Sequence, residues 1–326
     1  MTKAERNEFV HEPVLVDEVA EWLALPGGGV GFDLTVGGGS HLAVLARRSA
    51  PGAEFYGVDR DRDAVAAAQA NLRDTPQVKQ IICAPFGELA GVLAELNITT
   101  IDCALFDLGV SSFQIDTPRR GFSFQSEGPL DMRMDQTHTT TAEELINTLP
   151  ENELASLIFR YGEERRAKRV AREVIRVRSV RPMRTVQELR DTIETAVGPA
   201  NLTRTLARVF QALRSAVNDE LGELERALPQ ATQALNKGGR LGVISYHSLE
   251  DRIVKDFIRS QSGECVCPPG LPVCACGARE ELRALTRKPI NPGSSEIARN
   301  PRSRSAKLRV AERVSPISVP PTEVGQ

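Results

Sequence analysis

The sequence between Val30 and Val110 alternates four short β-type runs with helical stretches, and this alternation constrains the fold more than any other feature. The helical stretches repeat apolar residues at helical spacing, as Ala64, Ala68 and Leu72 do. Strand–helix–strand repetition predicts a parallel sheet with right-handed crossovers. We therefore expect an α/β, doubly wound, Rossmann-like sheet. The predicted strands are Val30–Leu34, Glu54–Val58, Val78–Cys83 and Ile101–Leu108.

From Thr141 the β-type runs stop for about sixty residues and helical periodicity replaces them. Thr141 and Glu144 have the spacing of a capping box, which opens a helix. Strand character returns at Arg240–Tyr246, after Lys237-Gly238-Gly239, which we expect to close a helix. The simplest organisation is a small all-helical domain inserted into the α/β domain. The predicted ranges are 1–135 and 206–314 for the α/β domain, 136–205 for the insertion and 315–326 for a disordered tail.

The composition of the 326 residues excludes several classes of protein. With 41% hydrophobic and 26% charged residues, the chain is ordinary for a globular protein. No stretch reaches the roughly 18 apolar residues of a spanning helix, so we expect no membrane partner. The first residues, MTKAERNEFVHEP, lack the apolar core of a secretory signal, and six cysteines are too few for a disulfide scaffold. These features predict a cytoplasmic protein in a reducing compartment.

A glycine-rich segment, FDLTVGGGSH from Phe32 to His41, leaves the first predicted strand and enters the first predicted helix. Open α/β sheets bind ligands at this edge, and glycines let the backbone approach a ligand closely. A nicotinamide-binding pattern fails because Leu42 stands where its last glycine belongs, and no P-loop lysine follows. Taken alone, the glycines are also explained by a structural turn.

The ends of the next strands favour a ligand-binding interpretation of the glycine segment. Asp59 ends the second strand, where a carboxylate accepts hydrogen bonds from ribose hydroxyls. Phe86 follows the third strand and offers an aromatic face to a purine, and Asp107 ends the fourth. A nucleoside without phosphates suits this set, which indicates S-adenosylmethionine rather than a dinucleotide. The alternative for Asp59 is a solvated loop acid beside Arg60 and Arg62.

Several longer strings carry a resemblance that runs from about residue 9 to residue 313. Together they are similar to the bacterial 16S ribosomal RNA cytosine-N4 methyltransferase family. The strings are HEPVLVDEV from His11, the glycine segment, VDRD from Val58, DLGVSSFQID from Asp107, GFSF and GPLDMRMD after Gly121, YGEER from Tyr161, SYHSLEDRIVK from Ser245 and NPRSRSAKLRVAER from Asn300.

The resemblance implies a methyltransferase sheet with an inserted helical domain, S-adenosylmethionine as cofactor, and 16S rRNA or the small ribosomal subunit as partner. Carried over position by position, it implies cofactor contacts at Gly39, Ser40, His41, Asp59, Phe86, Asp107 and Gln114. Two positions depart from the family, because Leu34 and Ser40 replace glycines. We expect Leu34 to change φ or narrow the loop, which bears on cofactor affinity, and Ser40 to retain its backbone N–H and to cap the helix.

The chemistry that the resemblance implies needs a hydrogen-bond acceptor beside a weakly nucleophilic cytosine amine. Asp107 is the expected acceptor. His247 is a second candidate, as proton acceptor for the methylated amine; the alternative is a helix-start histidine bonded to backbone. DNA amine methyltransferases stack the base on an aromatic residue where this chain has Val110. The sequence does not choose among the other aromatic candidates, which are Phe113, Phe122, Phe124 and Tyr246.

Two segments are strongly basic although the whole chain carries a formal charge of −2. Residues 160–184 contain ten Arg or Lys against three Glu, and residues 279–313 contain ten against four. Such segments attract phosphates, so we expect RNA there, with Arg302, Arg304 and Lys307 as the more informative set. The alternative for either segment is a solvated surface.

The cysteines and the functional rivals leave choices open. Cys83 and Cys103 lie in apolar runs and are expected to be buried. A C-x-C-x₆-C-x-C cluster permits a zinc tetrathiolate, an oxidised pair or a reduced loop; its members are Cys265, Cys267, Cys274 and Cys276. The rivals to an rRNA methyltransferase are a DNA amine methyltransferase and a catalytically idle RNA-binding assembly factor. Only the idle factor should fail to bind S-adenosylmethionine at micromolar concentrations.

Overall fold

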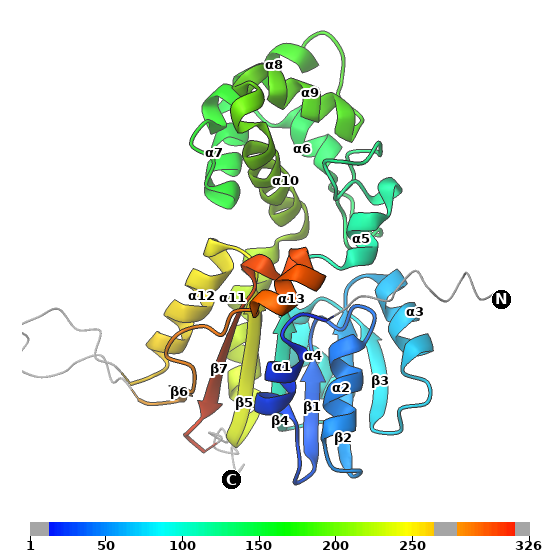
Figure 1. Cartoon of the computed structure of the whole chain (residues 1–326), viewed down its shortest axis with the longest axis vertical. Coiled ribbons are helices and arrows are strands. Elements are labelled where there is room, and N and C mark those ends of the chain that lie inside the picture. The colour runs from blue at the N-terminus through cyan, green and yellow to red at the C-terminus, as the bar shows by residue number, and fades with distance from the viewer. Residues whose placement is uncertain (1–12, 264–278, 317–326) are drawn as a thin grey trace, which may run out of the picture. The chain divides into compact units, whose positions relative to one another are not determined.

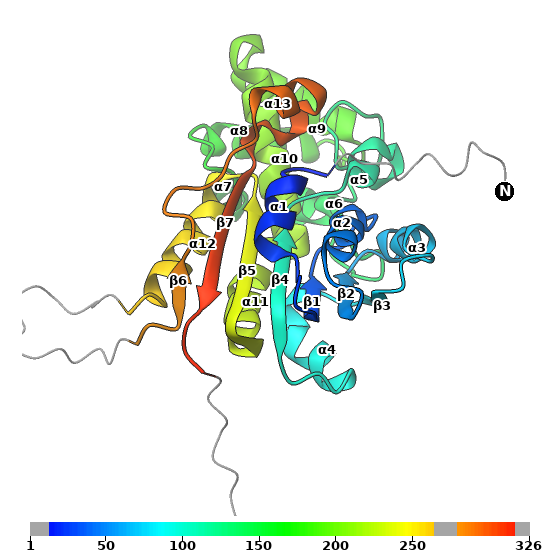
Figure 2. The same ribbon diagram turned by 60° about the horizontal axis from the view of Figure 1, so that its bottom comes forward.

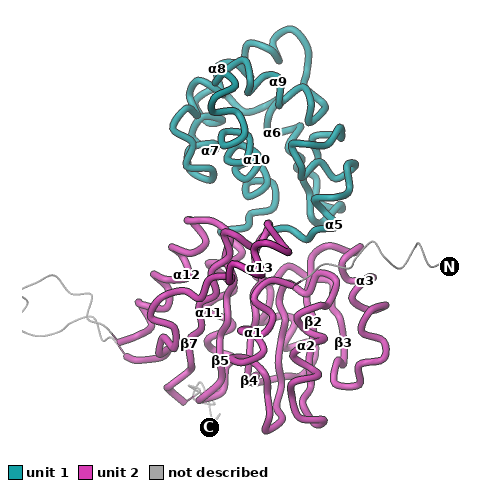
Figure 3. The backbone as a smooth tube through the Cα atoms, in the orientation of Figure 1, with its two compact units in different colours: residues 1–9, 110–221 teal, residues 10–109, 222–326 magenta. Residues whose placement is uncertain are grey.

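The computed structural model describes residues 13–263 and 279–316, which divide into two compact units (Figure 3). The helical unit comprises Val110–Leu221, and the α/β unit comprises the described residues on either side of it. The helical insertion that the sequence predicts, 136–205, lies inside the observed helical unit, which begins earlier and ends later. The cluster of four cysteines at 265–276 and residues 317–326 of the predicted tail lie outside the described residues.

The α/β unit contains one seven-stranded sheet in the order β3-β2-β1-β4-β5-β7-β6 (Figure 1). Strands β1 to β5 are parallel, and β7 runs antiparallel to both of its neighbours. The chain adds β2 and β3 on one side of β1 and then β4 and β5 on its other side. The boundary between β1 and β4 is therefore the topological switch point of the sheet. The predicted doubly wound fold is confirmed. The strands are β1 Gly29–Asp33, β2 Ala53–Asp59, β3 Val78–Cys83, β4 Ile101–Asp107, β5 Leu235–Ser245, β6 Leu282–Ala284 and β7 Lys307–Arg313.

Helices cover both faces of this sheet, each burying one apolar stripe (Figures 1 and 2). One face packs against α1 Val16–Leu23, α2 Ser40–Arg48 and α3 Arg62–Asn71. The other face packs against α4 Leu89–Glu95, α11 Glu220–Ala234 and α12 Ser248–Ser260. A short helix, α13 Ser294–Arg299, precedes β7. No helix in the described ranges is long and apolar enough to cross a membrane.

Two local expectations about the α/β unit are wrong. Lys237-Gly238-Gly239 does not close a helix: α11 ends at Ala234 and the segment lies inside β5 as an irregularity in its pairing with β4. Gly238 has φ +84°, which lets the strand kink there without breaking. Cys83 is exposed, because it ends β3 at the edge of the sheet, whereas Cys103 on the inner strand β4 is buried as expected.

The helical unit builds its own core. Its helices are α5 Ser112–Asp116, α6 Ala142–Thr148, α7 Glu151–Gly162, α8 Ala167–Arg178, α9 Val186–Val197 and α10 Leu202–Asn218. As the sequence predicts, Thr141 caps α6 through its side chain, accepting from the N–H of Glu144.

The segment before α6 belongs to the same core, which explains why the helical unit is larger than predicted. Leu130 and Met132 are fully buried within that core. The Asn218 amide at the end of α10 donates to the Met132 carbonyl at 2.7 Å and accepts from the Met134 N–H at 2.8 Å. The GPLDMRMD string is therefore a packed structural connection.

Candidate active site

Carboxylates end three adjacent parallel strands of the α/β unit: Asp33 on β1, Asp59 on β2 and Asp107 on β4. Asp33 is 1% exposed, and burial raises its pKa to about 7. The Asp107 and Asp59 carboxylates raise this pKa further, whereas His41 and the backbone N–H of Thr35 oppose the rise. A cation placed here would favour the ionised form of Asp33 and so oppose the effect of its burial on the pKa.

Asp59 shapes the glycine segment as well as ending β2. Its Oδ2 accepts from the N–H of Gly37 and its Oδ1 from the N–H of Asp61, both at 2.9 Å. Burial raises the pKa of Asp59 to about 6, against the lowering by these two N–H groups. Gly39 lies in the left-handed region at φ +85°, and a Cβ there would come within 2.6 Å of Leu72. The turn therefore depends on glycine at this position.

Leu34 does not alter the loop in the way the sequence suggests, and the expectation that Ser40 caps α2 is wrong, because the N-cap of this helix is Gly39. Leu34 is 1% exposed and packs in the core with Phe32 and Val58, away from the glycine turn. Neither Leu34 nor Ser40 is among the non-glycine residues with positive φ, and Ser40 is the first residue of α2. Leu34 lies in the turn that follows β1, its φ is outside the left-handed region, and its side chain has a place in the core.

Asp107 is held by groups from three other parts of the unit. The Tyr246 hydroxyl donates to its Oδ1 at 2.8 Å, and His41 Nδ1 lies 3.5 Å from its Oδ2. Its backbone N–H donates to the Thr35 hydroxyl at 2.6 Å. His41 Nε2 lies 2.9 Å from the Val14 carbonyl oxygen. From the sequence, Tyr246 is expected only as a residue on which the target base could stack. No local pattern connects it with Asp107, which lies 139 positions earlier.

Phe86 lies at the carboxyl end of β3 on a loop anchored by α11. Its ring meets Phe106 edge-on at a centroid distance of 5.7 Å and remains partly exposed. The N–H of Gly87 donates to Glu223 Oε2 at 2.7 Å, and the Gln230 amide donates to the Gly87 carbonyl at 2.7 Å. The sequence did not single out Glu223 or Gln230, because hydrogen bonds across more than 130 positions leave no local pattern.

Gln114 lies in the helical unit, where it has a local role. It is 5% exposed and forms a capping box with Ser111 at the start of α5. Its Oε1 accepts from the Ser111 N–H at 3.0 Å, while its own N–H donates to the Ser111 hydroxyl at 3.2 Å. A cofactor contact of Gln114 stays a prediction.

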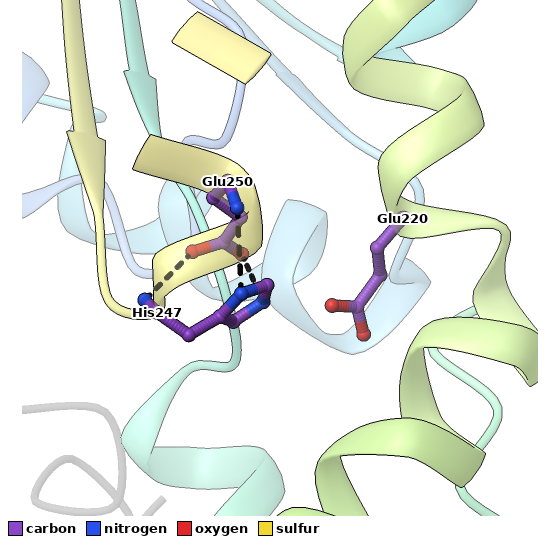
Figure 4. A group of neighbouring side chains, drawn as sticks. All are labelled: Glu220, His247 and Glu250. Carbon is purple, nitrogen blue, oxygen red and sulfur yellow. Dashed lines mark hydrogen bonds and ion pairs between the residues drawn. The ribbon is translucent and has the colours of Figure 1, made fainter. Parts of the chain in front are cut away.

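His247 caps α12, as Figure 4 shows. Its Nδ1 accepts from the N–H of Glu250 at 3.4 Å, and the Glu250 carboxylate accepts from the N–H groups of His247 and Tyr246. The Nδ1 lone pair is therefore used by the helix, so the geometry supports the helix-start alternative for His247. Glu220, also drawn in Figure 4, begins α11 and accepts from Arg214 Nε at 2.7 Å.

The side chains at these strand ends fit a cationic nucleoside and do not fit a phosphate. Asp59 and Asp107, together with Asp33 when it is ionised, place negative charge at neighbouring strand ends, which attracts a sulfonium and repels an anion. Asp59 uses one hydrogen bond on each oxygen and retains further lone pairs for ribose hydroxyls. Phe86 presents a partly exposed ring at the next strand end. The residues present therefore fit S-adenosylmethionine.

The two basic segments differ in how their cations are used. Lys307 and Arg309 on β7 are 3.0 and 2.7 Å from the Asp251 carboxylate on α12, so they attach this helix to β7. The prediction that Lys307 is available to RNA is weakened by this pair, whereas Arg302 and Arg304 are exposed.

Comparison with known proteins gives one consistent result. Residues 8–314 match the model of the MraW methylase family. "Ribosomal RNA small subunit methyltransferase H" of Geobacter sp. (strain M21) is 47% identical over 311 residues, covering 94% of this chain and 100% of the relative. The protein so named from Caldicellulosiruptor saccharolyticus is 44% identical over 307 residues, covering 94% and 100%.

A solved structure described as an rRNA methylase from Streptococcus thermophilus aligns at 14% identity over 92% of this chain and 94% of that chain. Its TM-score of 0.39 is too low to support a conclusion about the fold. The family match covers nearly the whole chain and includes all three strand-end carboxylates. The chain therefore belongs to the MraW methylase family.

Proposed function

We propose that this methylase transfers the methyl group of S-adenosylmethionine to the exocyclic N4 amine of a cytidine in small-subunit (16S) ribosomal RNA. The single observation that carries the proposal is the set of carboxylates at three neighbouring strand ends, Asp33, Asp59 and Asp107, of which Asp59 is hydrogen-bonded to the glycine turn. Family membership supplies the reaction class, and the names of the relatives support ribosomal RNA as the substrate.

The residues of this chain divide the task of binding the cofactor. S-adenosylmethionine supplies an electrophilic methyl group when it is bound. Asp59 binds the ribose hydroxyls and Phe86 lies against the adenine. The turn at Gly39, Ser40 and His41 receives the amino-acid end. Gln114 is a further cofactor contact implied by the family resemblance. Positioning of this kind lowers the barrier because donor and acceptor then meet in a near-attack geometry.

Asp107 has the catalytic role in this proposal. The lone pair of a cytosine amine is delocalised into the ring, so the amine is a weak nucleophile. A carboxylate that accepts a hydrogen bond from the amine returns electron density to its nitrogen. As the new N–C bond forms and the donor's S–C bond breaks, the amine nitrogen becomes cationic and then loses one proton. His247 is the second candidate for this proton. We assign the proton to Asp107, because Nδ1 of His247 caps α12 and its Nε2 lies 3.0 Å from the Glu250 carboxylate.

The helical unit provides the surface that we assign to RNA. Arg165, Lys168 and Arg169 are exposed at the start of α8, and within the described ranges their side chains make no ion pair or hydrogen bond. Other cations of α8 are occupied: Arg176 pairs with Glu173, and Arg178 donates to backbone carbonyls. Exposed cations without partners favour a polyanion as their ligand.

An exposed aromatic residue adds to this surface. Phe159, near the end of α7, is 61% exposed and precedes Arg160, whose guanidinium lies 5.4 Å from the Tyr161 ring centroid. A bare phenyl ring beside cations offers a base something to stack on. We call Phe159, Arg160, Arg165, Lys168 and Arg169 the α7–α8 surface.

The experiment that tests the function is labelled methyl transfer followed by nucleoside digestion. The substrates are unmodified ribosomal RNA, isolated small subunits and a DNA control. We expect N4-methylcytidine from one of the two ribosomal substrates. Methylation of DNA alone supports the DNA enzyme, and failure to bind S-adenosylmethionine at micromolar concentrations supports the idle assembly factor.

A further inference from the structure

The Asp107 carboxylate is held on both oxygens by side chains from two different elements. Tyr246, which follows β5, donates its hydroxyl to Oδ1 at 2.8 Å. His41, on the first turn of α2, places Nδ1 3.5 Å from Oδ2. The side chain of Asp107 is 19% exposed and that of His41 7%. A carboxylate so constrained has little freedom to rotate.

The second nitrogen of His41 shows where its proton must be. Nε2 lies 2.9 Å from the Val14 carbonyl oxygen, and both groups are buried. A carbonyl oxygen only accepts, so Nε2 carries a hydrogen. In a neutral ring, Nδ1 would then present a lone pair to the Asp107 oxygen, and the two would repel. A proton between Nδ1 and Oδ2 removes this conflict and joins the two side chains.

Tyr246 can act on Asp107 only as a donor. Burial raises the pKa of Tyr246 well above its ordinary value, and the Asp107 charge raises it further. Glu250 on α12 and Glu296 on α13 act in the same direction. The hydroxyl therefore keeps its proton. Asp33 is also close enough to interact with Asp107, and Asp59 interacts in turn with Asp33.

We propose that His41 and Tyr246 are positioning residues that keep Asp107 ionised and oriented, so that it accepts a hydrogen bond from the substrate amine over the working pH range. This inference rests on the proposed function and reassigns His41 from a cofactor contact to a partner of Asp107. Two donors stabilise the charged form of a carboxylate relative to its protonated form.

The test removes one hydroxyl. Tyr246→Phe keeps the ring and loses the donor to Asp107. A hydrogen bond to a charged group corresponds to a shift of about one pH unit in its titration. We expect the acid limb of the methyl-transfer pH profile to move up by about one unit and kcat at pH 7 to fall about tenfold. The dissociation constant of S-adenosylhomocysteine at pH 8 should change less than twofold. His41→Asn should move the acid limb in the same direction.

A second measurement needs no RNA. Sinefungin carries an ammonium group where S-adenosylmethionine has its sulfonium, so its affinity relative to S-adenosylhomocysteine reports negative charge in the site. As the pH is lowered, the preference for sinefungin over S-adenosylhomocysteine should be lost. In Tyr246→Phe this loss should occur at a pH about one unit higher than in the wild type. The matched control is Tyr56→Phe on β2, whose ring stacks on Phe32 at 5.0 Å and does not contact Asp107.

The outcomes separate the inference from the function. An acid limb and a ligand preference that stay at the wild-type pH in Tyr246→Phe overturn the inference. So does an equal shift in Tyr56→Phe, which would show a general effect on the sheet. If the wild type methylates no RNA, the proposed function fails, and the sinefungin measurement still decides the role of Tyr246. If Tyr246→Phe does not fold, His41→Asn gives the same decision.

Discussion

The raised pKa of Asp33 makes the unfolding free energy depend on pH through this one residue. Its pKa is about 7 in the folded chain because of burial, against 3.8 ordinarily. Between these values the folded state holds a proton that the unfolded state releases. The unfolding free energy therefore falls as the pH rises from about 4 to about 7, by roughly 4 kcal/mol for a three-unit shift.

Asp33→Asn removes this titration but retains a side-chain oxygen. In the wild type, the Thr35 N–H donates to Asp33 Oδ1 at 3.1 Å, and the asparagine oxygen can accept the same hydrogen bond. We expect the unfolding free energy of this variant to lose less between pH 5 and pH 8 than that of the wild type. Urea unfolding at four pH values measures the difference. Parallel pH dependences for the two proteins would show that Asp33 is ionised in the folded state throughout.

The role of His247, as a helix cap or as a proton acceptor, can also be tested with single substitutions. Because it caps α12, His247→Ala should reduce the unfolding free energy by about 1 kcal/mol, whereas His247→Asn should retain both the cap and methyl transfer. Thermal unfolding and the RNA methylation assay measure the two effects. A loss of more than a hundredfold in kcat for a folded His247→Asn would return the proton-acceptor role to His247.

At the scale of elements, α11 holds the loop of Phe86 and Gly87 in place. Glu223 accepts from the buried Gly87 N–H, and Arg226 donates to the same carboxylate at 2.9 Å. Glu223→Ala leaves this N–H without its partner, which costs about 1–3 kcal/mol. We expect a lower melting temperature and about tenfold weaker binding of S-adenosylhomocysteine, measured by calorimetry.

Glu225→Ala is the matched control, because Glu225 lies on the same helix, is exposed, and has no side-chain hydrogen bond or ion pair in the described structure. Equal losses in the two variants would mean that α11 itself, rather than its bond to the Phe86 loop, is being weakened.

At the scale of the molecule, the sequence predicted what depends on local pattern. Period and turn residues located the strands, so Asp59 and Asp107 could be assigned to strand ends, and the inserted helices followed from caps such as Thr141. Contacts between distant segments were not predictable. Asn218 ties the Met132 segment to α10, and this contact extended the helical unit beyond its predicted limits. The partnership of Tyr246 with Asp107 was missed for the same reason.

The α7–α8 surface makes a prediction for the whole protein bound to RNA. Three of its cations form no ion pair within the described structure: Arg165, Lys168 and Arg169. Their removal should therefore affect mainly the affinity for RNA. Each phosphate contact contributes about 0.7 to the slope of log affinity against log salt concentration for single-stranded RNA. Replacing all three by Gln should reduce the magnitude of the slope by about 2, with little change in the melting temperature.

A charge-matched variant separates a local surface from a general charge effect. Arg47, Arg73 and Lys237 are also exposed, belong to the α/β unit and have no side-chain partner in the described structure. Replacing these three by Gln changes the net charge equally, so it should leave the slope within experimental error of the wild type. Filter binding from 50 to 300 mM salt measures all three proteins. If both triple variants lose the same slope, RNA responds to the charge of the whole chain, and the α7–α8 surface has no special part in binding.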